Sequence, residues 1–171
     1  KDNKMTKRNL PPDSNIYRKK AIMEAQKQHE CLQRSQAAYH SGLKNLAKQL
    51  SLKGKAHKQH KDNYNKIAAE IVFNANNHNF DLFRIDLHGL ILDEIAHHLS
   101  ARVTEIINNK KNLNSRKLLV ITGQGKNSGV SGPKLKPAVI NYAIQHDIPH
   151  QVHPRNPGCI LMDLKKVDAL H

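Results

Sequence analysis

Two short apolar segments in the second half of the chain each run directly into a polar or glycine-containing turn, and this arrangement constrains the fold most strongly. The first is Arg84–Leu90, with the sequence RIDLHGL, and the second is Thr122–Ser128, with the sequence TGQGKNS. Each pattern is typical of a buried strand that ends in a turn and is followed by a helix. Because parallel strands end at one edge of a sheet, we expect both turns to face the same crevice.

The elements around these turns predict an α/β domain. Apolar patterns predict two helices, one carrying Leu92 to Ile107 and one carrying Leu135 to Ala143, and four strands at Leu82–Leu87, Lys117–Thr122, His150–His153 and Cys159–Leu164. The predicted order is β-α-β-α-β-β. This order gives a two-layer sandwich with a mixed four-stranded sheet, preceded by an N-terminal helical extension.

The N-terminal extension has sparse apolar residues at helical spacing. A first helix is predicted over Asp13–His40, a short second one over Leu43–Leu50, and a third over Lys55–Asn74, with Gly54 breaking the last two apart. A unit with such thin apolar stripes has little core of its own. A solvated helical spacer is favoured here over a specific binding face.

An Asn-rich break after position 74 is the predicted domain boundary. We therefore divide the chain into a flexible lead-in (residues 1–12), a basic helical module (13–78) and an α/β domain (79–171). The chain opens on Lys1 and not on Met, which suggests a fragment of a longer protein.

The charge of the chain is strongly positive and uneven. There are 28 Lys and Arg against 14 Asp and Glu, and residues 1–80 hold 16 of these basic and 6 of these acidic groups. Such an excess favours a polyanionic partner, because basic side chains displace counterions from phosphate; a solvated, solubilising surface is the alternative. With no Trp and three Phe, recognition of a nucleic-acid backbone or shape is favoured over base stacking.

Cysteine usage and hydropathy indicate the redox compartment of the protein and whether it associates with membranes. Cys31 and Cys159 lie in different segments without metal-ligand spacing, so we predict free thiols in a reducing compartment. No apolar run approaches the length of a membrane span, and we expect no membrane partner. The sequence shows no dedicated metal site and implies no cofactor, although a divalent-ion requirement stays open.

Asp86 and His88 are the first candidates for chemistry. Two residues apart on an extended segment, their side chains project to one side. Imidazole exchanges protons near neutral pH, and a neighbouring carboxylate can orient it, so His88 could activate an RNA 2′-hydroxyl. From the spacing alone, the favoured interpretation is an Asp–His pair that ties down a turn.

The glycine turn is the second candidate. It is not a P-loop, because Val120 stands where that motif needs glycine, and it lacks the third glycine of the dinucleotide fingerprint at Ser128. Its N–H groups could meet a phosphate at a helix entrance, with Lys126, Lys134 and Lys136 close in sequence. A tight turn with glycines only for backbone freedom is equally compatible with the sequence.

Taken together, several motifs resemble a small MutS-related (Smr) domain over about residues 80–165. They are IDLHGL at 85–90, TGQG at 122–125 with Ser128, LKPAV at 135–139 and NPGC at 156–159. Residues 15–77 resemble the helical module that often precedes Smr domains in eukaryotic proteins. The resemblance implies a β-α-β-α-β-β fold related to the C-terminal domain of a bacterial translation initiation factor. It also implies a nuclease-type or nucleic-acid-binding activity.

The resemblance also assigns roles to individual residues. Asp86 and His88 match the acid-X-His motif associated with cleavage, and Gly123, Gly125 and Lys126 match the loop associated with substrate contact. We predict Asp86 and His88 as catalytic residues. The predicted substrate-binding residues are Arg84, Gly123, Gln124, Gly125, Lys126, Asn127, Ser128, Lys134, Lys136 and Arg155.

Relatives with the same preceding module include endoribonucleases that cut mRNA on stalled, collided ribosomes. The leading hypothesis is therefore a cytoplasmic, monomeric Smr-type endoribonuclease acting on mRNA at the ribosome. The family often has His where this chain has Asn127, and asparagine cannot exchange protons near neutral pH. Two alternatives follow: a non-catalytic RNA- or ribosome-docking module, and a DNA-nicking endonuclease.

Overall fold

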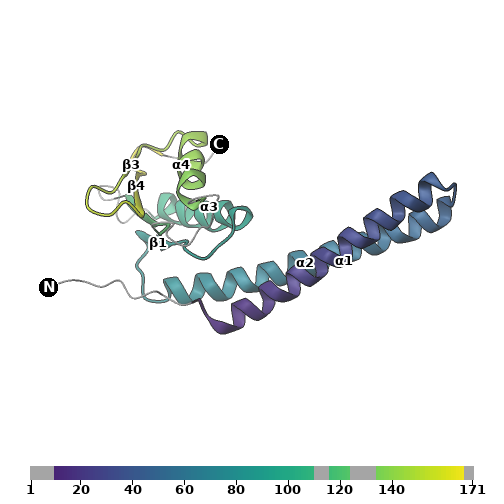
Figure 1. Cartoon of the computed structure of the whole chain (residues 1–171). Helices are drawn as coiled ribbons and strands as arrows, with labels where there is room; N and C mark the ends of the chain where they lie inside the picture. Colours follow the sequence, from purple (N-terminus) through teal and green to yellow (C-terminus); the bar gives the residue numbers. More distant parts are fainter. Residues whose placement is uncertain (1–9, 110–115, 124–133, 168–171) are drawn as a thin grey trace. The chain divides into compact units, whose positions relative to one another are not determined.

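The computed structural model of the protein describes residues 10–109, 116–123 and 134–167. Its contacts divide the chain into two compact units, Lys1–Val72 and Phe73–His171. The first unit is helical, and the second holds a four-stranded sheet with two helices (Figure 1). The predicted boundary after residue 78 stays a prediction. None of the described helices is long and apolar enough to cross a lipid bilayer.

The helical unit is a hairpin of two long helices, α1 (Pro12–His40) and α2 (Lys44–Asn77), and the last turn of α2, from Phe73 onward, belongs to the second unit. They run side by side in Figure 1 and are joined by a short turn in which Gly42 has a φ of +78°. Polar contacts fix their register: the Ser35 hydroxyl donates to the Ala47 carbonyl at 2.7 Å, and the Arg18 guanidinium donates to the Asn65 side-chain oxygen at 2.9 Å. Apart from Glu24, the residues that α1 buries are small, which lets the two helices approach closely; they are Ser14, Ala21, Cys31 and Ala38.

The prediction of separate second and third helices was wrong. Helix α2 is continuous through Gly54, which is buried. A Cβ on Gly54 would lie 3.4 Å from the Cβ of Cys31 and 3.5 Å from the side chain of Leu32, both on α1. These distances are ordinary contacts, so Gly54 packs against α1 in the interior of α2 and does not mark a helix end. Helix α2 also continues through Asn77, three residues beyond its predicted end.

The second unit has the predicted β-α-β-α-β-β order with a mixed four-stranded sheet. Its elements are β1 (Arg84–Asp86), α3 (Leu92–Asn108), β2 (Lys117–Ile121), α4 (Leu135–Gln145), β3 (His150–Val152) and β4 (Cys159–Asp163). The strand order is β1-β2-β4-β3, with β1 parallel to β2 and the other pairs antiparallel. Strand β1 begins two residues later than predicted, after the turn at Asp81–Phe83.

The core of this unit lies between the sheet and its two helices. Alternate strand residues, which share one face, are completely buried: Ile85, Leu118, Val120, Ile160 and Met162. Helix α3 contributes Leu99, Val103 and Ile106, and α4 contributes Val139 and Ala143, all of them fully buried. Helix α4 contacts both α3 and β4, so this two-layer core anchors the strands whose ends form the candidate site.

Candidate active site

The site forms where the parallel strands β1 and β2 end. Asp86 pairs with Ile121, and the Leu87 N–H donates to the Ile121 carbonyl at 2.8 Å. The segments that follow the two strands therefore leave the sheet side by side: β1 continues into His88, and β2 continues into Thr122 and Gly123. This geometry brings His88 and the first two residues of the glycine turn, Thr122 and Gly123, to one sheet edge, as the predicted parallel pairing requires.

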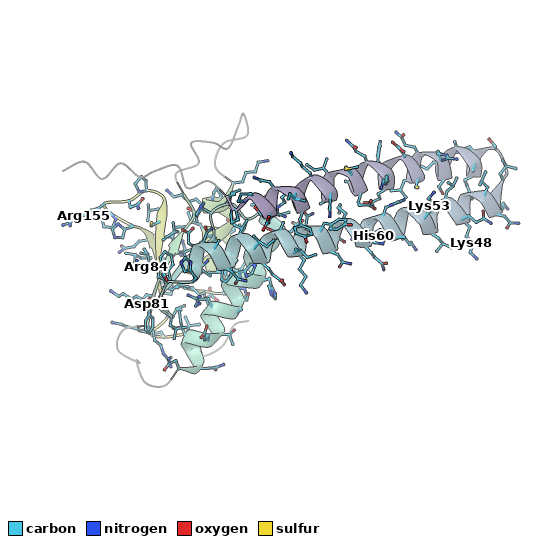
Figure 2. All side chains as sticks on the ribbon, turned by 90° about the horizontal axis from the view of Figure 1, so that it is seen from below. Lys48, Lys53, His60, Asp81, Arg84 and Arg155 are labelled. Atoms are coloured by element: carbon cyan, nitrogen blue, oxygen red, sulfur yellow. The ribbon has the colours of Figure 1, made fainter. Side chains whose placement is uncertain are left out.

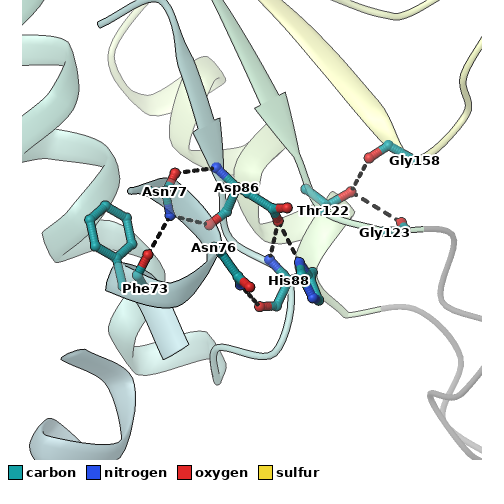
Figure 3. Close-up of polar contacts among 8 residues, drawn as sticks. All are labelled: Phe73, Asn76, Asn77, Asp86, His88, Thr122, Gly123 and Gly158. Atoms are coloured by element: carbon teal, nitrogen blue, oxygen red, sulfur yellow. Dashed lines mark hydrogen bonds and ion pairs between the residues drawn. The ribbon is translucent and has the colours of Figure 1, made fainter. Parts of the chain in front are cut away.

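Asp86 and His88 form a hydrogen-bonded dyad (Figure 3). The Asp86 carboxylate oxygen Oδ1 lies 2.7 Å from His88 Nδ1 and also accepts the His88 backbone N–H at 3.0 Å. The side chain of Asp86 is 1% exposed and that of His88 is 23% exposed. Asp86 therefore lies below the surface, and His88 reaches solvent.

This hydrogen bond determines which imidazole nitrogen can act as a base. An ionised carboxylate only accepts hydrogen bonds, so Nδ1 of a neutral His88 carries the hydrogen that points to Asp86. The other nitrogen, Nε2, then has the lone pair. The dyad thus has the arrangement in which an acid orients an imidazole for proton transfer.

Two asparagines of the last turn of α2 bind the backbone of Asp86 and His88, although the sequence predicts that they lie in a loop after the helix. The Asn77 amide donates to the Asp86 carbonyl at 2.9 Å and accepts the Asp86 N–H at 2.8 Å (Figure 3). Asn76 donates to the His88 carbonyl at 2.9 Å. Phe73, in the same turn, stacks on the His98 ring of α3 with centroids 4.1 Å apart. Two signals in the sequence point to them: they stand at helical spacing from Phe73, and they belong to the stretch that resembles the helical module preceding Smr domains.

The outer edge of β1 is bonded to side chains along its length. Asn77 occupies the backbone N–H and C=O of Asp86. The Arg102 guanidinium of α3 donates to the carbonyls of Asp81, Leu82 and Arg84. These contacts keep β1 in register up to the point at which His88 leaves the sheet.

On the side of β2, Thr122 and Gly123 begin the glycine turn. Thr122 is 5% exposed and is tied to the start of β4, because its N–H donates to the Gly158 carbonyl at 2.9 Å and its hydroxyl lies 3.2 Å from the same oxygen. Gly123 has a φ of +76°, and a Cβ on it would lie 3.8 Å from the Cβ of His88. The first glycine of the turn therefore lies beside the dyad. Gln124, Gly125, Lys126, Asn127 and Ser128 lie outside the described residues.

Arg84 and Asp86 are on the same face of β1, as their spacing predicts. The Arg84 guanidinium lies over the Phe80 ring at 5.2 Å from its centroid. The pKa of the Cys159 thiol is raised, mainly because the thiol is buried and in second place because of the charge of Asp86; the charge of Arg84 opposes this shift. Cys159 is thus a buried neutral thiol beside the dyad, and it is free, as is Cys31.

The remaining predicted substrate-binding residues are at two places. Arg155 is exposed in the turn between β3 and β4. This turn ends next to Thr122, because Cys159, the first residue of β4, pairs with Ile121. Lys134 is exposed at the start of α4, and Lys136 is half-buried in its first turn. Among the described contacts, none joins Arg155, Lys134 or Lys136 to the dyad. Their role in substrate binding stays a prediction.

Comparison with family models identifies the class of protein to which this fold and dyad belong. Residues 85–158 match the Smr domain, and residues 15–77 match a domain of unknown function, DUF1771. The chain therefore belongs to the Smr-domain family, in the arrangement in which a DUF1771 segment precedes the Smr domain.

Particular relatives share both segments. The chain is 37% identical to human NEDD4-binding protein 2 over 152 residues and 36% identical to endonuclease NBR9 of Saccharomyces cerevisiae over 133 residues. It is 33% identical over 132 residues to an Smr domain-containing protein of Schizosaccharomyces pombe. These matches cover 87%, 78% and 77% of this chain and span 8%, 54% and 62% of the relatives' own lengths.

Two solved structures are also similar. One is the solution structure of the B3BP Smr domain, with 33% identity and a TM-score of 0.45 over 58% of this chain and 94% of that one. The other is the crystal structure of a human small-MutS related domain, with 37% identity and a TM-score of 0.38 over 46% and 95%. The family assignment rests on the family models and not on these superpositions.

Proposed function

We propose that this protein is an Smr-type endoribonuclease that cleaves mRNA, with Asp86 and His88 as its catalytic residues. The observation that carries the proposal is the 2.7 Å contact between Asp86 and His88 beside Gly123. A relative 36% identical to this chain is named an endonuclease, which supports the same class of reaction. The net charge of +14 supports a polyanionic substrate.

The proposed reaction is an internal transesterification of RNA. His88 Nε2 accepts the proton of a 2′-hydroxyl, and the freed oxygen attacks the adjacent phosphorus while the bond from phosphorus to the 5′-oxygen breaks. The products are a 2′,3′-cyclic phosphate and a 5′-hydroxyl, whose proton comes from water, and the hydroxide left behind takes the proton back from the His88 imidazolium. Asp86 keeps Nδ1 protonated and stabilises the imidazolium that forms.

We further propose that the mRNA is cut on stalled or collided ribosomes in the cytoplasm and that the chain acts as a monomer. The support is the DUF1771 segment ahead of the Smr domain, which resembles that of RNA-acting relatives. Exposed lysines on α2, among them Lys48 and Lys53 (Figure 2), offer contacts to RNA phosphates. The same resemblance of the helical module is the reason why RNA is favoured over DNA as the substrate.

The direct test compares RNA cleavage by the unchanged chain with cleavage by Asp86→Asn and His88→Ala variants. General-base assistance contributes about 10²–10⁴-fold to rate, so we expect His88→Ala to lose activity on that scale. Asp86→Asn should also cleave slowly, because the asparagine amide can donate to Nδ1 of His88. It then favours the imidazole tautomer that has its hydrogen on Nε2, which cannot accept a proton there. His97→Ala, which removes an exposed imidazole on α3, is the matched control and should cleave normally.

The products and substrates distinguish the alternatives. Cyclic phosphate ends formed in excess chelator support the transesterification, whereas loss of all activity in chelator indicates a divalent-ion requirement. Binding without any cut ends would favour the docking module, which the Asn127 position motivates. Nicking of plasmid DNA in preference to RNA would favour the DNA endonuclease. Equal RNA cleavage by the unchanged chain and both folded dyad variants would remove the dyad from the mechanism.

A further inference from the structure

The helical unit contains a cluster of ligating side chains that the proposed cleavage does not use. Glu24 lies on α1, and His57 and His60 lie one turn apart on α2. A Glu24 carboxylate oxygen and one nitrogen from each imidazole all lie within 4.8 Å of one another. Such a set of one oxygen and two nitrogen ligands is one that transition metals prefer in proteins.

The geometry of the cluster is already close to that of a bound metal. His57 Nδ1 lies 2.7 Å from Glu24 Oε2, and His60 Nδ1 lies 3.4 Å from the same oxygen. Ligand atoms that share one tetrahedral Zn²⁺ at about 2.0–2.1 Å are about 3.4 Å apart. The contact between Glu24 and His57 has to lengthen by some tenths of an ångström, and the two imidazole nitrogens, which lie within 4.8 Å of each other, have to settle at about the same 3.4 Å.

Burial and charge at the cluster also suit a cation. The Glu24 side chain is 11% exposed, while those of His57 and His60 are 17% and 62% exposed, so the cluster is closed on the side of α1 and reachable from the side of His60. Hydrogen bonds from Lys27 and His57 hold the pKa of Glu24 at about 2. Lys27 contacts Oε1 at 2.8 Å, whereas both imidazoles approach Oε2.

We propose that α1 and α2 bind one divalent transition metal, with Zn²⁺ as the best-suited ion, through Glu24 Oε2, His57 Nδ1 and His60 Nδ1. Water supplies the fourth ligand at the exposed side of His60. The metal takes the place of the hydrogen between Glu24 and His57: His57 binds it in the tautomer whose hydrogen is on Nε2, so that Nδ1 offers its lone pair. Because Glu24 and His57 are 33 positions apart in the chain, the ion stabilises the hairpin by joining its two helices.

The test is a calorimetric titration of the full chain with ZnCl2, together with thermal melting at each metal concentration. We expect one Zn²⁺ per chain and a melting temperature that rises with free Zn²⁺, because a ligand that binds only the folded state stabilises it. His60→Gln should weaken this binding by about tenfold or more, which is the loss of roughly 1.4 kcal/mol of ligand energy. Its metal-free melting temperature should stay unchanged, since His60 is largely exposed.

The matched control is His29→Gln, which removes an exposed histidine of α1 outside the cluster and should leave Zn²⁺ binding intact. The His88→Ala variant should also bind Zn²⁺ normally, so the result does not depend on the proposed nuclease. Co²⁺ serves as a spectroscopic probe, and its tetrahedral absorption should disappear in His60→Gln alone. Equal Zn²⁺ affinity of the unchanged chain and His60→Gln, or no saturable binding by the unchanged chain, would overturn the proposal.

Discussion

At the scale of single residues, the candidate site depends on how a buried carboxylate is accommodated. Asp86 is 1% exposed, and a charge at such a depth is costly unless it is hydrogen-bonded. Its carboxylate is bonded to His88, and its backbone N–H and C=O are both bonded to the Asn77 amide. Asn77 is therefore as much a part of the site as the dyad, although it cannot exchange protons itself.

We predict that Asn77→Ala destabilises the second unit. The substitution leaves the buried N–H and C=O of Asp86 without their partner, and each such unpaired group costs about 1–3 kcal/mol. Urea unfolding should report the loss of unfolding free energy. Asn74→Ala, at an exposed position of the same helix, is the control. A loss no larger than that of the control would show that the Asn77 contacts carry little energy.

At the scale of elements, α2 shows that a glycine can lie inside a helix as well as end one. Glycine in a polar helical stretch often ends a helix, yet Gly54 lies inside a 34-residue helix, where it is packed against Cys31 and Leu32 of α1. The sequence contains no local sign of this neighbour, which is more than twenty residues away. Asn77 was missed for the same reason: the strand that its amide contacts comes only later in the chain.

Gly54→Ala should stabilise the helical unit. The added Cβ would meet Cys31 and Leu32 at 3.4–3.5 Å, which is ordinary contact, and alanine is favoured over glycine in a helix by about 0.8–1.0 kcal/mol. Gly54→Leu should instead destabilise the unit, because its larger side chain has to separate the helices. Thermal melting of both variants checks this, and equal destabilisation by alanine and leucine would contradict it.

The strands, in contrast, could be predicted almost completely. Runs such as Leu118–Ile121 and Ile160–Met162 have no other plausible place than a buried sheet, and the parallel pairing of β1 with β2 follows from the helix between them. Asp86 and His88 could be paired from sequence because they are two residues apart. The cluster of Glu24, His57 and His60 could not, because helix packing alone brings it together.

At the scale of the whole molecule, the charge distribution is the property that most affects a nucleic-acid partner. The excess of Lys and Arg is concentrated in residues 1–80, whereas the dyad lies in the second unit. The proposed long-range attraction of RNA and the proposed chemistry thus belong to different segments of the chain. We expect the affinity for RNA to come largely from backbone contacts, which are independent of sequence.

RNA binding by the chain should therefore fall steeply with salt. For single strands the logarithm of the binding constant changes by about −0.7 per phosphate contact for each tenfold rise in salt, so five contacts give about a 10²-fold loss between about 50 and 200 mM. Fluorescence anisotropy with a labelled single-stranded RNA measures this slope. Replacing Lys48 and Lys53 by glutamine should make the slope shallower, while the same change at the exposed Lys165 and Lys166 should alter it less. Affinity independent of salt would contradict a phosphate-driven interaction.

The bonding of the outer side of β1 has a consequence for solubility. A terminal strand normally offers a ladder of unused donors and acceptors to any extended peptide, including a second molecule of the same protein. Here the Asn77 amide and the Arg102 guanidinium take the place that such a peptide would fill. The contacts that position His88 therefore also protect the sheet against intermolecular β-pairing at that margin.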